Sequence, residues 1–146
     1  MFKDDPNGFN GYEWGKPSSK YPGLKLTQNR GGTDVFQKVE IFEKGNDALT
    51  LNGVILAHAR YRFVDDQLES IVFSFGELEN RDKLMHWLEE KYGKLSPAER
   101  KWRTIQWFGD QTTITLTYDR NTKLGSLWFI CQRLNHLMNA HADMSD

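Results

Sequence analysis

The stretch VILAHARYRFVDDQLESIVFSFG, residues 54–76, decides the fold because it holds two runs of alternating apolar and polar residues. The runs flank the polar residues 65–67, and such an arrangement predicts an antiparallel β-hairpin. A two-residue loop would mix the two faces of the hairpin, whereas a three-residue loop pairs Val64 with Leu68 and keeps them separate. We therefore expect the three-residue loop.

This register separates two kinds of side chain and places Arg62 opposite Ser70. One face receives the bulky residues Ala57, Ala59, Tyr61, Phe63, Ile71, Phe73 and Phe75. The other face receives His58, Arg60, Arg62, Ser70, Val72 and Ser74, so that Ser74 would lie opposite His58. Antiparallel sheets commonly bury one face and leave the other open. We expect the bulky face to form the core.

A helix over residues 80–92 follows the hairpin. Its sequence, NRDKLMHWLEEKY, has Leu84, Met85, Leu88 and Tyr92 at helical spacing. Asn80 is the expected N-cap, and Gly93 is placed to end the helix. This helix should cover the bulky face of the hairpin.

Further strands are expected on both sides of the hairpin and the helix, at residues 34–43, 102–108, 112–118 and 124–131. In the second half, Thr113, Thr115 and Thr117 share one parity and should face solvent. The sequence after residue 131 predicts a short amphipathic helix through Leu134, Leu137 and Met138.

These elements predict a single α+β domain over residues 1–146. Its curved antiparallel sheet would have about five to seven strands, with the main helix on one face and a short C-terminal helix. Residues 1–8 and 142–146 are expected to be flexible.

Composition excludes several classes of function. The net charge of −1 gives no overall field that would attract nucleic acid or an anionic membrane. Cys131 is the single cysteine, and the four histidines lack ligand spacing, so we expect no disulfide, metal or cofactor. There is no apolar run of about 20 residues and no signal peptide at the start. Taken as it stands, the sequence predicts a soluble cytoplasmic protein.

Residues 8–15, GFNGYEWG, resemble the G-F-x-G-x-x-W-G opening of small bacterial proteins of unknown function, which are often made with an export signal. The resemblance extends to the strand at residues 61–63, the hairpin, the helix ending at residues 91–93 and a strand containing Trp107. It implies a TATA-binding-protein-like or β-lactamase-inhibitor-protein-like arrangement. It also implies a location in the cell envelope, with a mature chain beginning near Lys3 and Met1 added for expression.

The leading functional hypothesis is a non-enzymatic binding or interaction module. Its candidate surface, for a protein or a small anionic ligand, comprises His58, Arg60, Arg62, Ser70 and Ser74, together with the segment of Trp14. The alternative for this surface is an ordinary solvated sheet face. Homodimerisation through an edge strand or the final helix is a further expectation.

Two other functions remain open. A small hydrolase-like enzyme would use a shallow site near His58 and Ser74, because nucleophilic catalysis needs a hydroxyl beside a base. Nucleic-acid binding would use residues 99–103, ERKWR, in which cations surround an aromatic ring. The non-functional interpretation of residues 99–103 is a solvated loop whose Trp102 packs back onto the protein.

Overall fold

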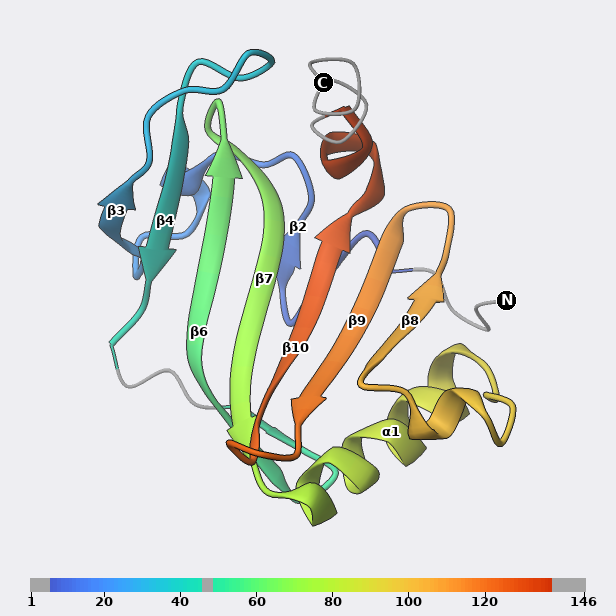
Figure 1. The fold of residues 1–146 in the computed structure, drawn as a ribbon. Coiled ribbons are helices and arrows are strands. Elements are labelled where there is room, and N and C mark those ends of the chain that lie inside the picture. The colour runs from blue at the N-terminus through green and yellow to red at the C-terminus, as the bar shows by residue number, and fades with distance from the viewer. Residues whose placement is uncertain (1–5, 46–48, 138–146) are drawn as a thin grey trace.

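The computed structural model describes residues 6–45 and 49–137, which are organised around an antiparallel sheet (Figure 1). The sheet has eight strands in the order β3-β4-β6-β7-β10-β9-β8, with β5 paired to β6. A separate pair, β1 and β2, precedes it. The strands are β1 (Gly8–Phe9), β2 (Tyr12–Glu13), β3 (Lys25–Asn29), β4 (Val39–Glu43), β5 (Leu49–Leu51), β6 (Val54–Val64), β7 (Gln67–Gly76), β8 (Thr104–Phe108), β9 (Thr112–Asp119) and β10 (Leu124–Cys131).

The helices are α1 (Leu78–Tyr92), two 3-10 turns, η1 (Ser18–Lys20) and η2 (Glu99–Lys101), and a short helical segment at residues 132–137. The predicted class, an antiparallel α+β fold with one main helix and a short C-terminal helix, is therefore confirmed. Of the two tails expected to be flexible, residues 1–5 and 142–146 lie outside the described residues. Gly8 belongs to β1, and the carbonyl of Pro6 accepts a hydrogen bond from the Thr112 hydroxyl (2.6 Å).

The turn between β6 and β7 has two residues rather than three. Asp65 and Asp66 both have positive φ (48° and 56°), and Val64 lies opposite Gln67. This is the conformation of the tight turns that match the twist of a hairpin. Aspartate adopts it more readily than most residues because its short side chain forms local hydrogen bonds. The predicted three-residue loop is wrong.

A β-bulge restores the predicted faces directly after the turn. Phe63 lies opposite Leu68 and Arg62 lies opposite Ser70, which leaves Glu69 as the extra residue on β7. The pairing of Arg62 with Ser70 is the predicted one. The bulky side chains on both sides of the bulge are buried as expected, with exposed fractions of 0–5% for Tyr61, Phe63, Ile71, Phe73 and Phe75.

A second irregularity lies at the other end of β6. Ala57 is paired with Ser74 and Arg60 with Val72, so β6 has one extra residue between them, and His58 has a φ of +53°. The irregularity reverses which side chains face the core. The predictions that Ala57 lies on the bulky face and that His58 lies opposite Ser74 are both wrong.

Two elements cover the bulky face of the sheet. The helix α1 lies across one end of the sheet (Figure 1) and buries Leu84 and Leu88 completely. The N-terminal strand pair covers another part, where the Phe9 ring stacks on Phe129 with centroids 3.8 Å apart and meets Phe73 edge to face. The helix alone was expected to cover this face. The Phe9 ring of the N-terminal strand pair covers the part that the helix leaves open.

The ends of α1 were predicted in part. Gly93 ends the helix as expected, with a φ of +140° and its N–H donating to the carbonyl of Glu89 (3.1 Å). Asn80 is not the N-cap, because the helix begins at Leu78 after Glu77. The Asn80 amide instead donates to the carbonyl of Gly76 (2.8 Å).

The N-terminal half contains more strands than its pattern predicted. The expected strand at residues 34–43 is limited to β4, because the Thr33 hydroxyl accepts hydrogen bonds from the N–H groups of Val35 and Phe36 and forms a local turn. The strands β1, β2, β3 and β5 were not predicted. In the second half, β8, β9 and β10 lie close to the expected ranges.

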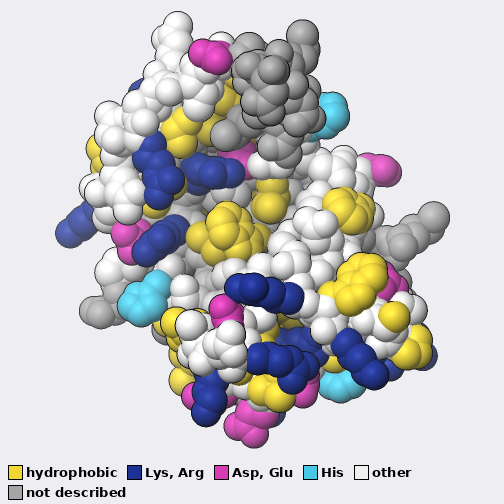
Figure 2. All heavy atoms as spheres, in the orientation of Figure 1, with side chains coloured by type: hydrophobic (Ala, Val, Ile, Leu, Met, Phe, Trp, Pro, Cys, Tyr) yellow, Lys and Arg dark blue, Asp and Glu magenta, His cyan; other side chains and the backbone are white. Residues whose placement is uncertain are grey.

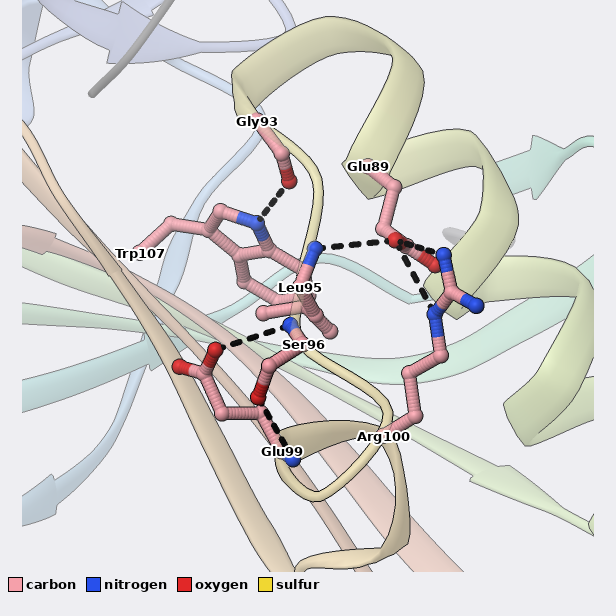
Figure 3. A network of polar contacts seen from close by, with 7 residues as sticks. All are labelled: Glu89, Gly93, Leu95, Ser96, Glu99, Arg100 and Trp107. Carbon is pink, nitrogen blue, oxygen red and sulfur yellow. Dashed lines mark hydrogen bonds and ion pairs between the residues drawn. The ribbon is translucent and has the colours of Figure 1, made fainter.

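A buried carboxylate joins α1 to the segment that leads into β8 (Figure 3). Oε2 of Glu89 accepts hydrogen bonds from Nη2 of Arg100 (2.8 Å) and from the N–H of Leu95 (3.0 Å). Beside this contact, the Trp107 indole donates to the carbonyl of Gly93 (2.9 Å). Burial opposes the charge on Glu89, but these hydrogen bonds outweigh it and lower its pKa.

We predict that Glu89 makes the fold acid-sensitive. Because its pKa is lowered in the folded chain from the ordinary value of 4.5, the unfolded chain takes up the proton first as the pH falls. The contribution of Glu89 to stability is complete above about pH 4.5. It is lost as the pH falls through the lower pKa that Glu89 has in the folded chain. Thermal unfolding measured from roughly pH 6 to pH 3 should show a smaller acid-induced loss for Glu89→Gln than for the wild type. Equal losses would contradict this role.

Candidate functional site

The face of the sheet opposite α1 carries a pocket of about 100 Å³. It lies over β4, β6, β7 and β10, and residues at the end of β3 form one side of it. Its lining residues are Gln28, Arg30, Ile41, Arg60, Arg62, Ser70, Val72 and Trp128. We call it the sheet-face pocket. Figure 2 shows this face, on which dark blue Lys and Arg side chains border a yellow hydrophobic patch in the middle.

Strand register brings these residues together. Arg60, Val72 and Trp128 form one row across β6, β7 and β10, because each is paired with the next. In the neighbouring row, Ile41 lies opposite Arg62. Side chains in directly opposed positions on one face are close enough to interact. The pocket therefore combines cations from β6 with apolar side chains from β4, β7 and β10.

One of the arginines is held in place by a fully buried carboxylate. Glu69, at the bulge, has no exposed surface and accepts hydrogen bonds from Nε and Nη2 of Arg62 (2.5 and 2.9 Å). It also accepts from the Ser70 hydroxyl (2.7 Å) and from the amide of Asn135 (2.9 Å) in the helical segment at 132–137. Burial of Arg62 opposes its charge, but Glu69 outweighs this and raises the pKa of the guanidinium. Arg62 is therefore a fixed cation at the pocket.

The other two arginines are less constrained. Arg60 is exposed, and within the described residues no carboxylate lies at ion-pair distance from it. Glu43 is opposite it in the β4–β6 pairing but forms no ion pair with it. Nε of Arg30 donates to the Gln28 side chain (3.2 Å), which is a neutral partner. Arg30 and Arg60 thus retain positive charge that the surrounding described side chains do not neutralise.

Trp128 provides the aromatic surface of the pocket. It is half-buried, and its indole N–H donates to the Ser126 hydroxyl (2.7 Å). With its polar atom bonded, the ring lies next to Val72, its partner on β7, and adds apolar surface to the pocket, which Ile41 also lines. An anion with an attached ring or short carbon chain suits this combination, because Arg binds oxyanions and stacks on planar groups.

The structure brings together half of the predicted candidate residues. Arg60, Arg62 and Ser70 line the sheet-face pocket. His58 and Ser74 are exposed but do not line it. Trp14 lies on the opposite, buried face, where it is 5% exposed and its indole donates to the Thr112 hydroxyl (2.7 Å). Its aromatic ring is part of the core.

Two residues of the predicted threonine stripe, Thr113 and Thr115, are shielded from solvent, which corrects the prediction that they face water, whereas Thr117 is half-buried. Thr113 and Thr115 are 8% exposed, and their hydroxyls accept hydrogen bonds from Gln132 and Gln106 respectively. The stripe is also not adjacent to the hairpin, because β10 lies between β7 and β9. Long amide side chains, which the alternation pattern ignores, cover the hydroxyls.

The pair that the hydrolase-like alternative would use, His58 and Ser74, is not brought together. No hydrogen bond joins His58 to Ser74, whose partner in the sheet is Ala57. Burial raises the pKa of the Cys131 thiol and so disfavours the thiolate nucleophile. Among residues 6–45 and 49–137, no group of three His, Cys, Asp or Glu side chains is placed to hold a metal ion.

Comparisons of the chain with family models, with curated proteins and with solved structures give no match. In the described part of the chain, no helix has the length and apolar character needed to cross a bilayer.

Four of the lining residues were not predicted from the sequence: Gln28, Arg30, Ile41 and Trp128. The sequence did indicate the orientation of Trp128. It lies between the core residues Leu127 and Phe129 on a predicted strand, so its side chain must point to the other face. Arg30 and Gln28 had none, because β3 was not expected and its place in the sheet is a long-range property. Glu69 was missed because a bulge, rather than alternation, determines its orientation.

We predict that Arg62 stabilises the fold in addition to lining the pocket, whereas Arg60 contributes little to stability. Arg62→Met leaves Glu69 buried without its cation and should lower the free energy of unfolding by about 3–5 kcal/mol. Arg60→Met, two residues away on the same strand, should change it by less than about 0.5 kcal/mol. Urea denaturation of both variants measures this difference. Similar small losses for both would show that the Glu69 pair does not stabilise the fold.

Proposed function

We propose that this chain is a non-enzymatic binding module whose sheet-face pocket takes a small ligand that joins an anionic group to an apolar ring or short chain. The observation that carries the proposal is the arrangement of Arg30, Arg60 and Arg62 around Trp128. None of the described residues that line this pocket is acidic. The arginines would bind the anion, and Trp128 would contact the apolar part.

Preorganisation supports this function. Arg62 is fixed by Glu69, so binding a ligand there costs little side-chain entropy. Within the described residues, Nη1 of Arg62 has no hydrogen-bond partner in the protein, whereas Nε and Nη2 both donate to Glu69. A carboxylate or phosphate oxygen above this nitrogen would receive a charge-assisted hydrogen bond.

The size of the pocket limits the ligand. A volume of about 100 Å³ is below the roughly 300–1,000 Å³ of sites that enclose a drug-sized molecule. It suits a single ring with one charged group, and it is open toward solvent. Benzoate is therefore a suitable probe, and benzamide is its neutral counterpart of almost the same shape.

We predict that benzoate binds the wild type and that Arg60→Met weakens this binding by about tenfold, because the substitution removes one charge-assisted contact. Isothermal titration calorimetry measures the affinities. Benzamide should bind at least about tenfold more weakly than benzoate, and added salt should weaken benzoate binding, since Arg60 is exposed.

The matched control is Lys94→Met, which removes an exposed cation outside the pocket. It should leave benzoate binding unchanged. Equal affinity for benzoate and benzamide would contradict recognition of the anion. An equal effect of Arg60→Met and Lys94→Met would contradict the assignment to this pocket.

A further inference from the structure

A second, larger cavity of about 220 Å³ lies away from the sheet-face pocket, where α1, the segment after η2 and the turn between β9 and β10 meet. Four of its lining residues are cations: Arg81, Lys101, Arg103 and Arg120. Of the lining residues that the structure describes, Asp119 alone is acidic. We call it the α1 cavity. Figure 2 shows several dark blue side chains around the end of the molecule that carries α1.

Two of these cations are already paired. Arg103 contacts Asp119 (3.0 Å), and Nη1 of Arg81 contacts Asp82 (3.0 Å). Lys101 and Arg120 are exposed, and neither has a carboxylate at ion-pair distance within the described residues. The α1 cavity thus holds two uncompensated positive charges beside two compensated ones, which favours an anion.

The segment that supplies the cations is held rigidly. Nη2 of Arg81, a residue that is 6% exposed, donates to the carbonyls of Arg100 and Trp102. Arg100 is in turn bound to Glu89 (Figure 3). The N–H of Tyr118 donates to the carbonyl of Arg103 (3.1 Å). Arg100, Trp102 and Arg103 are therefore fixed to α1 and β9, and Lys101 lies between two of these fixed residues.

The opposite wall is also preorganised. Oδ1 of Asp119 accepts a hydrogen bond from the N–H of Asn121 (2.8 Å), which shapes the turn after β9. Arg120 lies between these two residues and projects from a turn of defined geometry. An oxyanion in the α1 cavity would meet cations from both walls.

An exposed indole completes the α1 cavity. Trp102 was expected to pack back onto the protein, but it is 55% exposed, and this expectation is wrong. An exposed tryptophan beside uncompensated cations provides a stacking surface for a planar ring attached to an anion. Nucleobases have such rings, and their phosphate groups supply the anion.

We infer that the α1 cavity binds the phosphate group of a nucleotide, with the base stacked on Trp102. The volume fits a sugar phosphate but is below the range of clefts that enclose a whole ligand, so the base lies outside the cavity on the exposed indole. Free nucleotides and the end of a single strand share this chemistry. The site is independent of the sheet-face pocket, with which it shares no lining residue.

The test uses AMP, adenosine, ribose 5-phosphate and a short oligothymidylate, with calorimetry and tryptophan fluorescence as readouts. AMP should bind about tenfold more tightly than adenosine, because the phosphate meets Lys101 and Arg120. The double variant Lys101→Met/Arg120→Met should lose about tenfold in AMP affinity, while Lys94→Met loses nothing. Trp102→Ala should weaken AMP binding and leave ribose 5-phosphate unchanged, because only the base uses the indole.

The inference is overturned if adenosine binds as well as AMP or if the double variant binds AMP as the wild type does. If AMP binding instead depends on Arg60, the anion occupies the sheet-face pocket, and the α1 cavity is not the site. An oligothymidylate that binds more tightly than AMP, with a steeper salt dependence and the same sensitivity to Lys101 and Arg120, identifies a strand as the natural ligand. Equal affinities identify a free nucleotide.

Discussion

The interaction on which this architecture depends most is the burial of the Glu69 carboxylate in the bulge of β7. A charge without solvent must be compensated within the protein, and Arg62, Ser70 and Asn135 compensate it. These three partners come from β6, from β7 itself and from the C-terminal helical segment. The bulge therefore fixes the register of the central hairpin and attaches the chain after β10 to it. It also determines that a guanidinium stands on the open face beside Trp128.

The two proposed sites share one arrangement, in which paired arginines are held rigidly and unpaired cations are available to an anionic ligand. In the sheet-face pocket, Arg62 is fixed and Arg60 is free to meet a ligand. In the α1 cavity, Arg81 is fixed by Asp82 and two carbonyls, and Lys101 is free. A surface ion pair adds little stability, so an exposed cation without a partner costs the fold almost nothing. It can therefore be kept for binding, and the near-neutral net charge of −1 does not prevent local sites of this kind.

Local pattern was sufficient to predict the class of fold, the separation of rings from cations between Tyr61 and Phe75, and most of α1 and the last three strands. These features depend on alternation and helical spacing, which are properties of neighbouring residues. The two-residue turn at Asp65 was missed because a tight turn followed by a bulge and a three-residue loop both place Arg62 opposite Ser70. From that pair onward, the two arrangements predict the same alternation of buried and exposed side chains. The position of β10 between β7 and β9, and of β3 beside β4, depends on contacts between distant segments. Arg30 and Trp128 therefore could not be assigned to one pocket with Arg60, and the exposure of Trp102 was likewise a tertiary property.

The most direct test of the account is to map benzoate on the protein by two-dimensional ¹H–¹⁵N NMR, following the backbone and indole N–H signals as the ligand is added. The account predicts that the largest shifts occur at Arg60, Val72 and the indole of Trp128, which share one row of the sheet, while the buried indole of Trp14 does not move. Shifts concentrated elsewhere, with the Trp128 indole unaffected, would contradict the claim that the open face of the sheet is a binding surface.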